Sequence, residues 1–361
     1  MMKTAILVLV AVATAVAQQD WRQASRDYSL AVPRDHVSHP AFKIEWWYYT
    51  GNLDTSRGRR FGYQATFFRI GVDLSPKNPS RFAVRDLFLA HAAVTDVEGK
   101  RYVSAERLNR AGAGTAGASA SEFAVWNVDW EARSEYGRHK VHARESHFAF
   151  DLTLTEDRPA VLHGDHGYSQ KGATPGNASE YYSLTRMPTE GTVTIEGEPF
   201  QVRGASWMDH EFGTTFLEKY QQGWDWFALQ LEDGTDLMLF ELRRRDGSID
   251  PQSSGTLVPG ASQPKRLGPA DFTLTPGRRW TSAASGGAYP VEWQIRLPSE
   301  KLDLAIKPVL DAQELVGGRT GIRYWEGAID VEGTRDGHPI RGRGYGELTG
   351  YAGGALGDML R

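Results

Sequence analysis

The stretch Gly204-Ala205-Ser206-Trp207-Met208-Asp209-His210-Glu211-Phe212-Gly213 places three ionisable side chains in a row within an aromatic setting. A second aromatic stretch, Gly223-Trp224-Asp225-Trp226-Phe227, follows shortly after it. If both stretches are strands, successive side chains point to opposite faces. Asp209 and Glu211 then share one face of the strand, and His210 lies on the other.

A carboxyl group that is enclosed by tryptophan and tyrosine rings loses solvation, and this loss raises its pKa. Such a group can act as a general acid near neutral pH. The alternative is structural, with Asp209 or Glu211 paired with an arginine or accepting hydrogen bonds from the backbone. Residue type alone favours the structural alternative, because structural carboxylates are common.

Composition excludes several classes of function. The 361 residues allow one large domain or two, and a net charge of −4 provides no bulk attraction to nucleic acid or to an acidic membrane surface. We therefore expect no nucleic-acid partner and only indirect membrane contact. The chain has no cysteine, which excludes disulfides, thiolate nucleophiles and thiolate metal sites.

Residues 1–17 have the pattern of a secretory signal peptide. Lys3 supplies the positive charge, residues 5–16 are apolar or small, and Ala15-Val16-Ala17 is a small-residue cleavage site. The alternative is an uncleaved membrane anchor, but the apolar run is too short to span a bilayer comfortably. The pattern predicts cleavage before Gln18 and a secreted or periplasmic protein.

Short strand patterns separated by turn signals dominate the rest of the chain. Residues 45–53 and 59–70 are rich in aromatic and β-branched side chains, and residues 54–58 between them have turn composition. Residues 111–121 are rich in Gly, Ala and Ser, which predicts a flexible loop. Long amphipathic helical patterns are hard to find, so the sequence predicts an all-β sandwich or barrel architecture.

The two halves of the chain also resemble each other. Trp46-Trp47-Tyr48-Tyr49 opens the first half and Trp224-Asp225-Trp226-Phe227 opens the second, each before a turn and a strand that ends on arginine. Residues 191–204 and 327–344 close the halves with the same order of Gly, Glu-Gly, Pro and Arg-Gly. Aromatic hairpins can look alike by chance, but agreement at both ends favours a duplication.

We therefore expect two similar β-domains in tandem, residues 18–215 and residues 216–361, which share an edge near residues 205–223. The aromatic clusters at the start of each half suggest a ligand cavity between the domains. For most individual aromatic residues core packing is the alternative, and for His91 a satisfied core histidine is the more frequent explanation. The predicted substrate-binding residues are Trp46, Trp47, Tyr48, His91, Tyr181, Tyr182, Trp207, Trp224 and Trp226.

Several familiar catalytic motifs are absent from the sequence. It has no G-x-S-x-G elbow, no H-E-x-x-H and no P-loop. Asp165-His166 and Asp209-His210-Glu211 lack a recognisable spacing of metal ligands. We therefore expect no metal and no cofactor, and the chemistry that remains is acid–base chemistry and binding.

Several stretches, in this order along nearly the whole chain, resemble the CrtC/AttH-like family. They are Glu45-Trp46-Trp47-Tyr48-Tyr49-Thr50-Gly51, residues 89–96, residues 167–172, Tyr181-Tyr182-Ser183, Trp207-Met208-Asp209-His210-Glu211, Gly223-Trp224-Asp225-Trp226-Phe227 and residues 344–351. The resemblance implies two tandem lipocalin-like β-barrel domains. The family includes carotenoid 1,2-hydratases, fungal pericyclases and exported bacterial proteins, many labelled secreted hydrolases, that are encoded beside ABC-transporter components.

In the hydratases, an acidic residue of the Trp-Met-Asp-His-Glu stretch is thought to protonate a carbon–carbon double bond. The resemblance assigns that role to Asp209, with His210 or Glu211 adjusting its acidity. The first hypothesis is thus an exported enzyme that uses acid catalysis in hydration, isomerisation or hydrolysis of a hydrophobic substrate between the domains.

The second hypothesis is a carrier without catalysis, which binds a lipid or another hydrophobic molecule and exchanges it with ABC-transporter components. A third is a scaffold protein whose aromatic residues all belong to the core.

Overall fold

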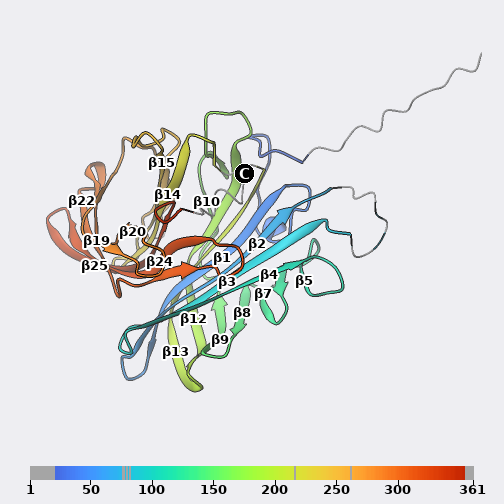
Figure 1. The fold of residues 1–361 in the computed structure, drawn as a ribbon. Helices are drawn as coiled ribbons and strands as arrows, with labels where there is room; N and C mark the ends of the chain where they lie inside the picture. The colour runs from blue at the N-terminus through green and yellow to red at the C-terminus, as the bar shows by residue number, and fades with distance from the viewer. Residues whose placement is uncertain are drawn as a thin grey trace, which may run out of the picture.

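The computed structural model describes residues 21–74, 78, 80, 83–214, 217–260 and 262–353, so the predicted signal peptide lies outside the described residues. Two curled β-sheets form two barrel-like domains that lie side by side (Figure 1), which confirms the predicted fold of tandem lipocalin-like barrels. The described helices are two 3-10 turns, η1 (Arg34–His36) and η2 (Pro298–Glu300). Neither has the length or apolar character that crossing a membrane would require.

The first sheet has the strand order β4-β3-β2-β1-β13-β12-β9-β8-β7-β6-β5, and β10 and β11 also pair with β12. Its strands are β1 (Ile44–Thr55), β2 (Arg60–Gly71), β3 (Asp86–Asp96), β4 (Arg101–Arg110), β5 (Ala116–Ala118), β6 (Ala124–Asn127), β7 (Trp130–Glu135), β8 (Arg138–Arg144), β9 (Phe148–Thr155), β10 (Val161–Leu162), β11 (Tyr168–Gln170), β12 (Ala178–Ile195) and β13 (Glu198–Gly213).

The second sheet has the order β17-β16-β15-β14-β25-β24-β22-β21-β18, with β23 also on β24. Its strands are β14 (Gln221–Leu231), β15 (Asp236–Arg244), β16 (Ser254–Val258), β17 (Lys265–Leu267), β18 (Thr273–Pro276), β21 (Trp293–Leu297), β22 (Leu302–Pro308), β23 (Glu314–Val316), β24 (Arg323–Arg335) and β25 (His338–Thr349). A separate hairpin consists of β19 (Arg279–Thr281) and β20 (Ala288–Pro290).

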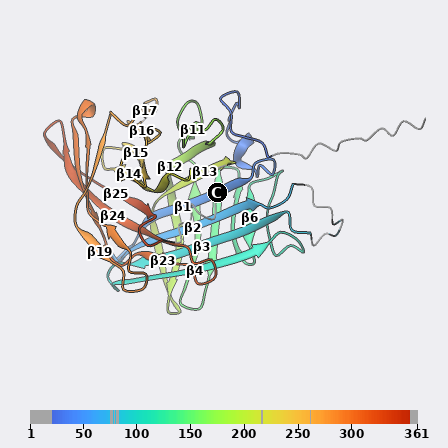
Figure 2. The ribbon, with the colours of Figure 1, turned by 45° about the horizontal axis from the view of Figure 1, so that its top comes forward.

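The two sheets are built in the same way. In each, four consecutive strands form a meander, and the first of these pairs with the last strand of its own half, β1 with β13 and β14 with β25. The sequence similarity between the halves falls on these equivalent strands, because Trp46 and Trp224 lie on β1 and β14. Figure 2 shows the meander β1 to β4 side by side. The equal strand order agrees with a duplication.

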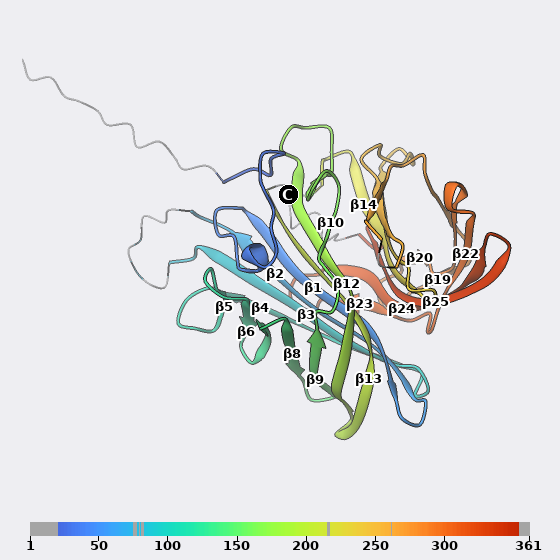
Figure 3. The same ribbon diagram turned by 180° about the vertical axis from the view of Figure 1, so that it is seen from behind.

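The strands at the junction are buried on both faces. One face of β1, β12 and β13 contributes Trp47, Tyr182 and Met208 to the core of the first barrel. The opposite face contributes Tyr48 and Tyr181 to a second core, which is shared with the other half of the chain. In Figure 3 the strands β14, β24 and β25 lie beside β1 and β12. The two domains therefore pack through the outer faces of their sheets.

The segment predicted as a flexible loop, residues 111–121, contains a strand, because β5 pairs with β6. Small residues are needed there, since the ring of Trp126 covers Gly117. A Cβ atom on Gly117 would lie 2.6 Å from Cζ2 of that ring. The Gly/Ala composition reflects this close packing as well as turns.

A buried ion pair between β1 and β2 also binds the N-terminal segment through hydrogen bonds. Glu45 is fully buried and accepts hydrogen bonds from Arg69 Nε at 3.0 Å, Ser38 Oγ at 2.8 Å and His210 Nε2 at 3.0 Å. Arg69, only 2% exposed, also pairs with Asp86 at 2.9 Å. Since no water reaches this carboxylate, removal of the guanidinium leaves a buried charge that is poorly compensated.

We predict that Arg69→Met lowers the free energy of unfolding by about 3–5 kcal/mol. The matched control is Arg101→Met, because Arg101 pairs with Glu196 at the surface, where the two side chains are 44% and 50% exposed. The control should lose no more than about 1 kcal/mol. Urea denaturation followed by tryptophan fluorescence measures both, and equal losses would contradict the assignment of Arg69 to the buried network.

Candidate active site

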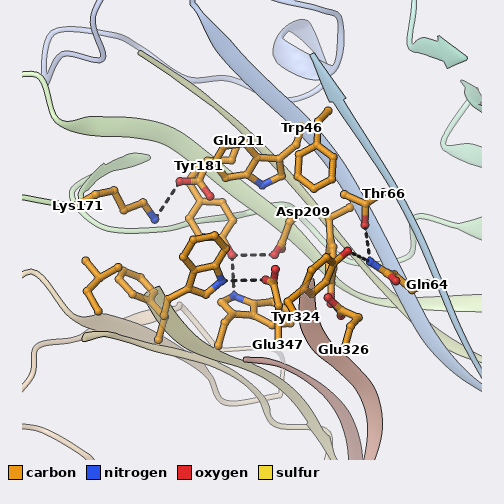
Figure 4. A pocket seen from close by; sticks show the side chains of 16 residues that line it. Trp46, Gln64, Thr66, Lys171, Tyr181, Asp209, Glu211, Tyr324, Glu326 and Glu347 are labelled. Atoms are coloured by element: carbon orange, nitrogen blue, oxygen red, sulfur yellow. Dashed lines mark hydrogen bonds and ion pairs between the residues drawn. The ribbon is translucent and has the colours of Figure 1, made fainter. Parts of the chain in front are cut away.

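A cavity lies between the outer faces of the two sheets, with a volume of about 60 Å³. Figure 4 shows the side chains that surround it. The first half contributes Trp46, Tyr48, Gln64, Thr66, Phe68, Lys171, Tyr181, Asp209 and Glu211, and the second contributes Trp224, Trp226, Phe240, Leu242, Tyr324, Glu326 and Glu347.

Strand register brings Asp209 to the cavity. On β13 it lies opposite Tyr48 of β1 on one side and opposite Ser183 of β12 on the other. Its neighbour Glu211 lies opposite Trp46 and Tyr181 in the same two ladders. Because the side-chain period is two, both carboxyls and their ring neighbours emerge on the face that meets the second domain.

Asp209 is buried at 4% exposure, and within the described residues it forms no ion pair. Its Oδ1 accepts hydrogen bonds from Ser183 Oγ and from Trp207 Nε1, the latter at 2.6 Å, and its Oδ2 accepts one from Tyr181 at 2.8 Å. Burial raises the pKa of Asp209 to about 7; the three hydrogen bonds oppose this rise, and the charge of Glu211 adds to it.

Glu211 has a different partner. Lys171 Nζ lies 2.9 Å from Glu211 Oε1, and Ser179 donates a hydrogen bond to the same oxygen. The ammonium group also lies over the rings of Tyr181 and Phe240, at 5.0 Å and 4.4 Å from their centroids. Of the two carboxyls in the stretch, Glu211 is therefore neutralised by a cation and Asp209 is not.

Two further carboxyls reach the cavity from the second domain. Glu347 accepts a hydrogen bond from Trp224 Nε1 at 3.0 Å, and burial raises its pKa to about 7. Glu326 accepts one from the hydroxyl of Tyr48. Burial, followed by the charge of Glu347, raises the pKa of Glu326 well above its usual range.

The predicted site residues separate into two groups. The cavity lining includes Trp46, Tyr48, Tyr181, Asp209, Glu211, Trp224 and Trp226. The structure places Trp47, His91, Tyr182, Trp207 and His210 outside that lining.

His210 points away from Asp209, into the first barrel. Its Nε2 contacts Glu45 and its Nδ1 lies 3.1 Å from the hydroxyl of Tyr182, while its ring stacks on Trp47 with a centroid distance of 5.0 Å. This placement corrects the expectation that His210, Trp47 and Tyr182 act at the cavity. The reason is the strand alternation, which puts them on the barrel-core face.

Trp207 and His91 do not line the cavity, but each contacts a residue that does. Trp207 belongs to the core between the domains and donates its indole N–H to Asp209. His91 Nδ1 lies 2.7 Å from the hydroxyl of Tyr324, which lines the cavity, and its Nε2 lies 3.3 Å from Glu106. Both residues position groups of the cavity without lining it.

Within the described part of the chain, one group of side chains has the composition of a metal site, namely His39, Glu45 and His210. Glu45 Oε1 lies 2.9 Å from His39 Nδ1 and 3.0 Å from His210 Nε2, and Arg69 occupies the other carboxylate oxygen. Those distances are hydrogen-bond lengths, and the positive guanidinium disfavours an adjacent cation. The group is a structural hydrogen-bond network.

The cavity also contains Gln64, Tyr324, Glu326 and Glu347, which the sequence patterns did not indicate, and Lys171, from a polar loop that they left open as pocket mouth or surface. The sequence does contain a pattern that indicates the two glutamates. Each stands two positions after a tyrosine in a strand, in Tyr324-Trp325-Glu326 and in Tyr345-Gly346-Glu347. A charged residue on the same face as a buried ring marks a site that needs a partner or a proton.

Comparison with solved structures shows what the fold resembles. AttH (NE1406) from Nitrosomonas europaea is 34% identical with a TM-score of 0.83, and the match covers 92% of this chain and 99% of that chain. Kievitone hydratase from Nectria haematococca is 19% identical with a TM-score of 0.69, covering 92% and 96%. CghA is 11% identical with a TM-score of 0.50, covering 90% and 97%. The two more distant likenesses establish the fold alone.

Among curated protein sequences no match was found. The family model described as AttH-like, in contrast, matches residues 23–351, which is nearly the whole described chain. This match and the Nitrosomonas structure confirm the resemblance to the CrtC/AttH-like family that the sequence motifs indicated. The chain belongs to the AttH-like family.

Proposed function

We propose that this protein is an acid–base enzyme that protonates a carbon–carbon double bond of a hydrophobic substrate in the cavity between its domains. The observation that carries the proposal is Asp209, a buried carboxyl group without a cationic partner in a cavity lined by aromatic rings. Similarity to a fold that includes a hydratase supports this reaction class. An exported location and exchange with ABC-transporter components stay predictions from the sequence.

The acid form of Asp209 has a defined geometry. Its Oδ1 already accepts two hydrogen bonds, so the proton is carried by Oδ2, beside the hydroxyl of Tyr181. That hydroxyl also accepts a hydrogen bond from Trp226 Nε1 at 3.2 Å. The surrounding donors hold the carboxyl in one orientation and stabilise the carboxylate that forms after the proton leaves.

The reaction begins when Asp209 donates its proton to one carbon of the double bond. The π bond breaks, a C–H bond forms, and the other carbon becomes cationic. A trisubstituted alkene gives a tertiary cation, which the ring faces of Trp46, Trp224 and Trp226 can stabilise.

In a hydration, the oxygen of a water molecule then forms a bond to the cationic carbon. One proton of that water returns to the carboxylate of Asp209, so the sum of the steps adds one water to the alkene. Loss of a different proton from the cation to the same carboxylate would give an isomerised alkene instead. Both outcomes restore the acid form.

Asp209→Asn should lower kcat by about 10²–10⁴-fold, because it removes the proton donor and keeps the shape of the side chain. The assay incubates the protein with a small, water-soluble trisubstituted alkene such as 3-methylbut-2-en-1-ol and follows the gain of one water by mass spectrometry. Asp225→Asn is the matched control, since Asp225 is equally buried on β14 but bonds Arg243 and Tyr351. Full activity in Asp209→Asn would show that Asp209 is structural.

Activity should fall as the pH rises through about 7, because Asp209 must hold its proton to act and its pKa is raised to about 7. The profile of kcat/KM against pH measures this directly. An activity that increases through this range would contradict an acid role and indicate that the carboxylate acts as a base.

The raised pKa of Asp209 also predicts how the stability of the folded state depends on pH. Its folded pKa lies above its unfolded value, so the folded state loses stability as pH rises from about 4 to about 7. Asp209→Asn should therefore gain stability relative to the unaltered chain at pH 8 and gain little at pH 4. Thermal unfolding at the two pH values checks the sign, and an equal shift at both would contradict it.

A further inference from the structure

Glu326 and Glu347 have an unusual position relative to each other. They lie directly opposite in the β24–β25 ladder, both on the face that lines the cavity. Like charges that face each other across strands destabilise a sheet. Within the described chain neither glutamate forms an ion pair, whereas the buried Glu45 and Asp236 contact Arg69 and Arg186. At least one of the two glutamates therefore holds a proton.

Hydrogen bonds indicate which oxygen carries that proton. Glu347 Oε2 accepts from Trp224, and Glu326 Oε1 accepts from Tyr48, but Glu326 Oε2 is buried and has no hydrogen-bond partner. A buried polar atom without a partner is costly. Of these oxygens Glu326 Oε2 is the one that is buried without a partner, so we place the proton there, and it then needs an acceptor.

A second unpartnered atom lies at the same end of the cavity. Gln64 donates through Nε2 to the hydroxyls of Thr66 and Tyr324, at 3.1 Å and 3.0 Å, and its Oε1 is buried without a partner. Tyr324 and Glu326 share a face of β24, and Gln64, which bonds Tyr324, lines the same cavity. Figure 4 shows Gln64, Tyr324 and Glu326 on one side of the cavity and Lys171 on the other.

We infer that this end of the cavity binds the uncharged oxygen of the substrate, a hydroxyl or a carbonyl, with Glu326 in its acid form as the hydrogen-bond donor. The inference rests on the proposed function and names its substrate class, which is a neutral, mainly apolar molecule with an oxygen near its double bond. Tyr48 lies between Asp209 and Glu326, because it is opposite Asp209 in the strand ladder and its hydroxyl donates a hydrogen bond to Glu326. Glu326 is a binding residue for the substrate oxygen, and Asp209 is the acid.

The charge of the cavity disfavours a carboxylate ligand and sets a condition on a cationic one. A carboxylate ligand such as a fatty acid would add a negative charge beside Asp209, Glu326 and Glu347, and Lys171, the cation of the lining, already pairs with Glu211. A cationic ligand would bind tightly only if these carboxyls were ionised, because their negative charge would then attract it.

The test uses three soluble six-membered-ring probes at pH 7, namely cyclohexanone, cyclohexanecarboxylate and cyclohexylammonium, with affinities measured by ligand-observed NMR. The unaltered protein should bind cyclohexanone at least about tenfold more tightly than either ion. Glu326→Leu should weaken cyclohexanone binding about tenfold, whereas Glu326→Gln, which keeps an N–H donor, should stay within about threefold. Tightest binding of the ammonium probe, or equal binding by all three proteins, would overturn the inference.

A second measurement uses only the unaltered protein, so it does not depend on whether the Glu326 variants fold. The infrared C=O stretch of bound cyclohexanone should shift to a lower frequency than in an aprotic solvent, because a carboxylic acid donates to it. An unshifted band, or no binding of cyclohexanone, would overturn the inference. These are binding measurements without turnover, so they can fail while the loss of proton transfer in Asp209→Asn still supports the proposed function.

Discussion

The pairing of β1 with residues 206–213 of β13, where both faces are buried, is the constraint on which the rest of the structure depends. Alternate residues of these strands serve different cores. His210 stabilises the first barrel through Glu45 and Tyr182, whereas Asp209 and Glu211 face the second domain. A shift of one residue would exchange the two sets, placing two carboxyls in a barrel core and a histidine at the cavity. The register of this strand pair therefore determines which side chains face the cavity as well as which pack in the barrel core.

Charge compensation separates structural carboxyls from those available for chemistry. Glu45 and Asp236 contact guanidinium groups, and Glu211 contacts Lys171. Asp209 lies two residues from Glu211 on the same strand face but has only neutral donors around it. Burial without a cationic partner raises the pKa of Asp209 to about 7. The packing of the two domains supplies the free energy that keeps such groups out of water.

Much of the architecture could be read from the sequence because it follows from local periodicity. Alternation predicted that Asp209 and Glu211 share a face without His210, and the echo of Trp46 in Trp224 pointed to repeated β-units. The same local rules could not say what packs against each face. Trp47 and Tyr182 look identical in type to Trp46 and Tyr181, yet they lie in a barrel core because of a one-residue offset. Glu326 and Glu347 come from strands more than a hundred residues away, and only the packing of the second sheet brings them to Asp209.

The position of the cavity follows from how the two barrels are filled. Large side chains such as Tyr49 and Phe61 occupy the first barrel, and Trp325 and Trp293 occupy the second, so the described residues fill both interiors with side chains. The outer faces of β1, β13, β14 and β25 are rigid, hydrogen-bonded surfaces, and a space between two such surfaces keeps its shape. One surface supplies Asp209 and the other supplies Glu326, so neither half forms the lining of the cavity by itself. A duplicated barrel can therefore acquire chemistry that a single copy lacks, because the contact between the copies is buried on both sides and free to diverge in each.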